Sequence, residues 1–91
     1  MKNYLPLVEL LAGLAEECCE LGQAALKLRR VYDGGNPTPT TQEDAIDAFE
    51  EEVADVELYL EQIGYSRGHV RDIKAAKRER WEARLNAGVN H

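Results

Sequence analysis

The sequence predicts an all-α protein, in which helices joined by short loops form an antiparallel bundle that is completed by oligomerisation. Three observations favour this fold class. Apolar residues recur at spacings of three and four, as on the buried face of a helix, and no period-two strand pattern or internal repeat occurs. The chain has 91 residues, enough for one small domain. Three helices of this size leave apolar surface uncovered, so we expect a partner subunit.

The first helix is expected over Leu5–Val31. Its apolar positions form an unbroken stripe, and Pro6 suits the first turn, where a missing N–H costs nothing. Gly34 lies just past the last apolar position, where glycine commonly ends a helix. The linker at 34–41, GGNPTPTT, holds two glycines and two prolines and is predicted to be neither helix nor strand.

The second helix is expected to begin at Thr40 or Thr41 and to run to about Ile63. Thr41 and the aspartate three residues later have the spacing of a capping box, and a glycine follows the last apolar position. Ser66 can cap a third helix, which is expected to run to about Asn86. All three helices belong to one domain spanning residues 1–91.

The charge of the chain is distributed unevenly. Residues 1–65 hold 4 basic and 14 acidic residues, whereas residues 66–91 hold 7 basic and 3 acidic ones. An acidic body with a basic last segment suits a site that binds a metal and phosphate, although on charge alone a solvated acidic surface with a polar last helix is the favoured interpretation. The net charge of −6 argues against binding to a nucleic acid polymer.

A cytoplasmic location is expected from the distribution of apolar residues. No run approaches the roughly 20 apolar residues of a membrane span, so no membrane partner is expected. The N-terminal segment soon becomes acidic, which does not suit a signal peptide. The compartment is therefore expected to be reducing.

Two adjacent cysteines, Cys18 and Cys19, lie in the first helix but are not expected to carry chemistry. Neighbouring helical side chains diverge by about 100°, so both cannot face one metal. The chain has no other cysteine, and a zinc site normally needs three or four Cys or His ligands. Cys18 falls in the apolar stripe and is predicted to act as a small hydrophobe. A Cys18→Ala/Cys19→Ala variant is therefore expected to keep the activity of the protein.

Each of the first two helices carries two acidic residues, three positions apart, at the edge of its apolar stripe. Glu17 and Glu20 form the first pair, and Glu52 and Asp55 form the second. Residues three apart share one face of a helix. If the two helices pack together, four carboxylates meet near the apolar core, which is costly unless something compensates their charge.

A hard divalent cation is the natural compensator, and we expect Mg²⁺, with Mn²⁺ as a substitute. A di-iron site of the ferritin type needs Glu-x-x-His, and neither His69 nor His91 follows a glutamate at that spacing. The alternative is that the acids form ion pairs with Lys77, Arg80 or Arg84 of the third helix. The pattern alone does not decide between a metal and ion pairs.

The order of these motifs resembles that of the all-α nucleoside triphosphate pyrophosphatases, specifically the small MazG-like proteins. Residues 16–20, EECCE, match EExxE, and residues 52–55, EVAD, match ExxD. The similarity extends over most of the chain and includes the loop GGNPTP and the K-x-x-R-W run that ends at Trp81. The linker between the two motifs is somewhat long for that family.

The resemblance implies an enzyme that hydrolyses nucleoside triphosphates, with ribose or deoxyribose, to the monophosphate and pyrophosphate in the presence of Mg²⁺. This activity would serve the cleansing of nucleotide pools. The resemblance also implies a homodimer or homotetramer. The metal ligands would be Glu17, Glu20, Glu52 and Asp55, with Glu16 as a supporting acid, and Lys77 and Arg80 would bind the substrate phosphates.

Three further residues are candidates for contacts to the nucleotide base. Asn36 could read a base edge or simply form a turn. Trp81 and Tyr59 could stack on a base, but packing in the core or at an interface is the favoured interpretation for both. Two other functions remain open: a non-catalytic regulator that binds nucleotide on the same fold, and a helical interaction protein whose acids form ion pairs.

Overall fold

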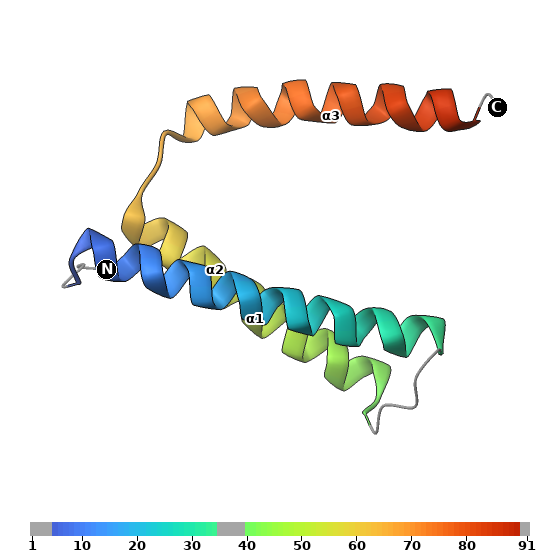
Figure 1. The fold of residues 1–91 in the computed structure, drawn as a ribbon, viewed down its shortest axis with the longest axis horizontal. Helices are drawn as coiled ribbons and strands as arrows, with labels where there is room; N and C mark the ends of the chain where they lie inside the picture. The colour runs from blue at the N-terminus through green and yellow to red at the C-terminus, as the bar shows by residue number, and fades with distance from the viewer. Residues whose placement is uncertain (1–4, 35–39, 90–91) are drawn as a thin grey trace.

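The computed structural model describes residues 5–34 and 40–89, and this part of the chain contains three α-helices and no strand. Helix α1 spans Leu7–Asp33, α2 spans Gln42–Ile63 and α3 spans Arg67–Val89 (Figure 1). The predicted all-α class is confirmed. Each helix begins and ends within three residues of the predicted position.

Short-range signals set where the helices begin. The carbonyl of Pro6 accepts hydrogen bonds from the N–H groups of Glu9 at 3.0 Å and Leu10 at 3.1 Å. The hydroxyl of Thr41 accepts the N–H of Asp44 at 3.0 Å, and the hydroxyl of Ser66 accepts the N–H of His69 at 3.2 Å. Each cap satisfies a donor that has no partner within its own helix, so the predicted capping roles of both residues are confirmed.

Two glycines end the first two helices. Gly34 has a φ of 66° and donates its N–H to the carbonyl of Arg30 at 3.0 Å. Gly64 has a φ of 77° and donates its N–H to the carbonyl of Leu60 at 2.9 Å. Residues with a Cβ rarely adopt these values of φ, which explains why glycine follows each helix.

Helices α1 and α2 pack against each other as an antiparallel hairpin (Figure 1). Leu10 of α1 and Ala45 of α2 are buried between them. Half-buried residues extend the contact along both helices: Leu14, Leu21 and Ala24 in α1, and Ile46, Phe49, Val53, Val56, Leu60 and Ile63 in α2. The face of α1 that was expected to carry Glu17 therefore lies against α2.

Helix α1 is in tight contact with a side chain of α2 at Gly13. A Cβ atom added to this residue would overlap the ring of Tyr59 on α2. The absence of a side chain at Gly13 thus makes room for the aromatic ring in the helix interface. This contact agrees with the packing interpretation of Tyr59.

Alanine at Gly13 is expected to give a less stable protein than alanine at Gly22, by about 1–3 kcal/mol, because it overpacks the interface with Tyr59. No atom lies within 4 Å of a Cβ placed at Gly22, so Gly22→Ala is the matched control in the same helix. That control should gain up to about 1 kcal/mol from helix propensity. Urea unfolding of both variants measures the difference. Equal stability of the two variants would show that the ring of Tyr59 moves aside at no cost in free energy.

The predicted bundle of three helices does not form within one chain. Helix α3 packs against neither α1 nor α2 and projects away from the hairpin (Figure 1). The radius of gyration is 17.2 Å, against about 12 Å for a compact domain of this length. Charged residues are frequent in α3, and its apolar positions are few, so burial against its own hairpin would gain little.

The orientation predicted for α3 is also wrong within one chain. Lys77 and Arg80 have the helical spacing that puts them on one face with Val70 and Ile73, and this spacing predicts that both basic residues point inward. Instead, both basic residues are exposed, and Ile73 keeps 40% of its surface exposed. An inward face requires a neighbouring element, and the described part of this chain supplies none to α3.

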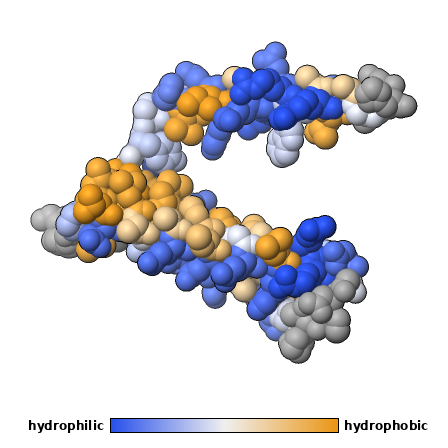
Figure 2. Space-filling model, in the orientation of Figure 1, coloured by the Kyte–Doolittle hydropathy of each residue, from blue (hydrophilic) through white to orange (hydrophobic). Residues whose placement is uncertain are grey.

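Much apolar surface is left uncovered. Figure 2 shows apolar side chains gathered over the end of the hairpin where α1 begins and α2 ends. The chain exposes 7454 Å². A compact monomer of 10.2 kDa exposes about 5,300 Å². The exposed large apolar residues are Leu5, Leu7, Val8, Leu11, Leu26, Tyr32, Leu58, Tyr65, Ile73, Trp81 and Leu85.

Candidate metal centre

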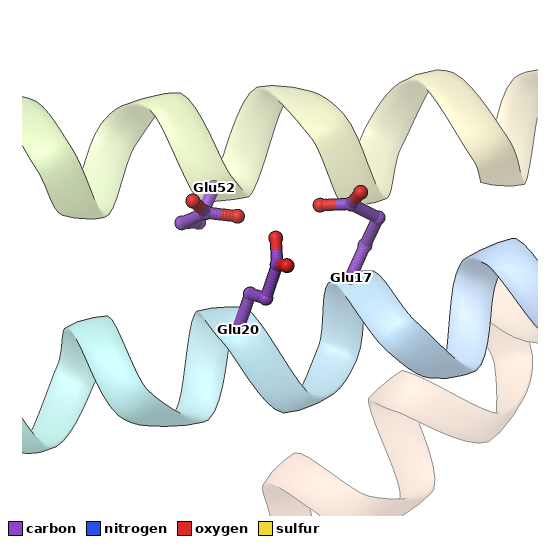
Figure 3. A group of neighbouring side chains, drawn as sticks. All are labelled: Glu17, Glu20 and Glu52. Carbon is purple, nitrogen blue, oxygen red and sulfur yellow. The ribbon is translucent and has the colours of Figure 1, made fainter.

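Three of the predicted ligands converge at the middle of the hairpin. Glu17 and Glu20 extend from α1 and Glu52 from α2 into the space between the helices (Figure 3). One carboxylate oxygen of each lies within 4.8 Å of the other two. The spacing of three residues in α1 and the contact with α2 together produce this acidic cluster, defined here as Glu17, Glu20 and Glu52.

Two oxygens of the acidic cluster are shielded from solvent. Oε2 of Glu17 and Oε2 of Glu52 are buried and have no hydrogen-bond partner within residues 5–34 and 40–89. A buried polar atom without a partner costs free energy, and the cost is larger for a charged group. The cluster is therefore an unfavourable arrangement unless a proton or a cation compensates it.

The pKa values of the cluster reflect the same conflict. Burial, together with the charges of the neighbouring carboxylates of Glu20 and Asp55, raises the pKa of Glu17 to about 7. The pKa of Glu52 is also raised, chiefly by burial and then by the charges of Glu20 and Asp55. Both groups thus bind a proton more tightly than an ordinary carboxylate, as expected where negative charges share a poorly solvated site.

The residues of the cluster suit a hard divalent cation. Mg²⁺ prefers oxygen ligands at about 2.0–2.1 Å, so ligands on opposite sides of the ion are about 4.2 Å apart. Neighbouring ligands of an octahedral ion are about 2.9 Å apart, so separations of up to 4.8 Å would have to shorten by up to about 2 Å through side-chain rotation when an ion binds. A cation would also provide the missing partners of the two buried oxygens.

The two remaining acids of the motifs lie outside this closest group. Asp55 is half-buried on α2, near enough for its charge to raise the pKa of Glu17 and of Glu52. It can therefore complete the ligand set after a modest rearrangement. Glu16 is exposed on α1, so any supporting role would act from the rim of the site.

The structure does not bring the basic residues of α3 to the acidic cluster. Lys77 and Arg80 lie on α3, together with Trp81, which keeps 64% of its surface exposed. Since α3 does not contact the hairpin, the alternative of ion pairs between these cations and the acids is not realised within the described chain. Asn36 lies outside the described residues.

A groove beside the acidic cluster contains cations that the sequence reasoning missed. It has a volume of about 610 Å³ and runs between α1 and α2, with Glu20, Glu52, Lys27 and Arg30 among its lining residues. In the sequence, both basic residues fall in the last turns of the first helix, where cations complement the helix dipole, and this position alone does not indicate a site. Their spacing could have indicated a shared site, because Lys27 follows Glu20 by seven residues. Seven residues are nearly two helical turns, so both side chains lie on one face of α1.

The two cysteines are free, and both are exposed. Cys18 is predicted to act as a small hydrophobe in the apolar stripe, and the structure shows that this position is not covered within one chain. The reason is that α2 contacts the neighbouring face of α1, which carries Leu10, and leaves the stripe from Leu7 to Tyr32 partly open.

Comparison with known proteins gives no relative: no family model matches the chain, and neither do any of the curated proteins or solved structures compared with it. Among the described helices, none has the length and hydropathy needed to span a membrane.

Proposed function

We propose that the protein hydrolyses nucleoside triphosphates to the monophosphate and pyrophosphate with the help of Mg²⁺, as an all-α pyrophosphatase of the MazG-like type. The observation that carries this proposal is the acidic cluster. Carboxylates from EExxE and from ExxD meet across the helix interface, and two of their oxygens are buried without partners. Acids placed only for solubility would not need to be shielded in this way.

In the proposed reaction, Glu17, Glu20, Glu52 and Asp55 hold the metal and fix its position between α1 and α2. Bound Mg²⁺ would polarise a phosphoryl oxygen and lower the pKa of a coordinated water. The oxygen of a water molecule bonds to the α-phosphorus, and the bond from that phosphorus to the bridging oxygen breaks. The products are the monophosphate, pyrophosphate and a proton.

Product analysis tests the proposal. The purified protein is incubated with each common ribo- and deoxyribonucleoside triphosphate and Mg²⁺ or Mn²⁺, and pyrophosphate is measured separately from orthophosphate. We expect equal amounts of monophosphate and pyrophosphate from at least one nucleotide. Release of orthophosphate alone, or no product from any nucleotide, would contradict the proposal.

The proposed site belongs to an oligomer. The exposed surface exceeds that of a compact monomer by about 2,100 Å², whereas a standard interface covers about 800 Å² on each partner. The acidic hairpin and the basic segment that includes α3 also carry opposite net charges, which favours contact between copies. The phosphate-binding role proposed for Lys77 and Arg80 requires that α3 of a second copy lies near the acidic cluster.

We expect light scattering after gel filtration to give the mass of a dimer or tetramer, and Leu11→Glu to shift the population toward monomer or unfolded chain. Leu11 keeps 48% of its surface exposed in one chain, so a charge there should harm only a covered interface. Gln42→Glu places the same charge at an exposed polar position and serves as the control. A wild type that stays monomeric as its concentration is raised would contradict the assembly.

A further inference from the structure

The groove between α1 and α2 combines opposite charges in an order that suits a metal-bound polyphosphate. Two cluster acids, Glu20 and Glu52, line it together with two cations, Lys27 and Arg30. Lys27 and Arg30 follow Glu20 by seven and ten residues, or about 10 and 15 Å along the axis of α1. A phosphate chain that begins at a metal in the acidic cluster would therefore run toward both cations.

Arg30 has an incomplete set of hydrogen bonds. Its Nε atom is buried and has no hydrogen-bond partner within the described residues. A guanidinium group is a planar donor that matches phosphate oxygens. An anion in the groove would supply the acceptor that this nitrogen lacks. The remaining lining residues are small or neutral: Gln23, Ala24, Leu26, Ala45 and Ala48.

We propose that this groove is the binding site for the β- and γ-phosphates of the nucleotide, and for pyrophosphate as product, with Lys27 and Arg30 as their ligands. The proposal deepens the proposed function and rests on it for the identity of the nucleotide. It assigns phosphate binding to residues of the same chain as the acidic cluster. The acids at one end of the groove repel a bare anion, so binding requires a divalent cation.

Titration calorimetry with inorganic pyrophosphate tests the groove without any turnover. We expect wild-type protein in saturating Mg²⁺ to bind pyrophosphate, and Arg30→Gln and Lys27→Gln each to weaken it at least about tenfold, the scale of a charge-assisted hydrogen bond. Arg30→Lys keeps the charge and should recover part of the loss. Without Mg²⁺, binding should be lost in all proteins.

Arg29→Gln is the matched control, because it removes the same charge from the adjacent, exposed position of α1, which does not line the groove. It should bind pyrophosphate as the wild type does. Circular dichroism and Mg²⁺ affinity, measured for every variant, identify any loss caused by misfolding or by damage to the acidic cluster.

The outcomes distinguish a failure of the proposed phosphate-binding groove from a failure of the proposed hydrolysis. Pyrophosphate binding that falls in the Lys27 and Arg30 variants but not in Arg29→Gln supports the groove, even if no nucleotide is hydrolysed and the proposed function fails. Binding that is equal in all variants overturns the groove, and so does a wild type that releases pyrophosphate from nucleotides but does not bind it. In both of those cases the proposed function can still stand.

Discussion

Replacing Glu52 with glutamine is expected to lower the rate of Mg²⁺-dependent pyrophosphate release by about 100-fold or more, the scale on which loss of a preorganised electrostatic contact acts. Oε2 of Glu52 is one of the two buried oxygens without a partner, and it comes from the helix opposite Glu17 and Glu20. Glutamine keeps the size of the side chain but removes its charge. The initial rate of pyrophosphate release at saturating nucleotide and Mg²⁺ measures the effect.

The neighbouring glutamate provides the control for this substitution. Glu51 is exposed on α2 and lies outside the acidic cluster, so Glu51→Gln removes the same charge from the same helix. We expect this variant to retain the wild-type rate. A Glu52→Gln protein with the wild-type rate would show that the acidic cluster is not the catalytic centre.

Magnesium is expected to raise the melting temperature by about 5 °C or more at saturation, and to raise it more at pH 8 than at pH 5.5. Without metal, Glu17 has a pKa of about 7 in the folded chain, against 4.5 for an ordinary glutamate. The folded state therefore binds its proton more tightly. The resulting stability is fully present below pH 4.5 and is lost as the pH rises through 7. Metal binding competes with protons, so its effect grows over the same range.

Thermal melts at the two pH values, with Mg²⁺ and with a chelator, measure this linkage. In Glu17→Gln the loss of metal-free stability between pH 5.5 and 8 should become smaller, because the shifted group is gone. The stabilisation by Mg²⁺ should also fall. If the wild type melts at the same temperature with and without Mg²⁺ at pH 8, the cluster does not bind the ion.

The helices could be predicted from the sequence because their signals are local. Thr41 and Ser66 cap the helices that follow them, and Gly34 and Gly64 end the helices before them, each through contacts within four residues. The convergence of Glu17, Glu20 and Glu52 also followed from short-range periodicity, once one contact between two helices was assumed. These features need no knowledge of the rest of the chain.

Features that depend on which surfaces meet could not be predicted in the same way. Two neighbouring faces of α1 carry apolar residues, so the sequence alone did not show which of them packs against α2. The face with Leu10 is the one that packs. Cys18 lies on the other face and is therefore exposed. The position of α3 is not fixed by packing against α1 or α2, so no contact within the described chain could be used to predict it. The groove is formed by residues of both α1 and α2, so the spacing of Lys27 and Arg30 along one helix did not reveal it.

The confinement of tertiary contacts to the α1–α2 hairpin has a consequence for the kinetics of folding. These contacts join helices that are neighbours in the chain, so the hairpin can form without closing long loops, and low contact order favours fast folding. Burial of the remaining apolar surface requires an encounter between copies, which is a second-order step. In the proposed oligomer, refolding should therefore show a fast phase that is independent of protein concentration and a slower phase whose rate rises with it.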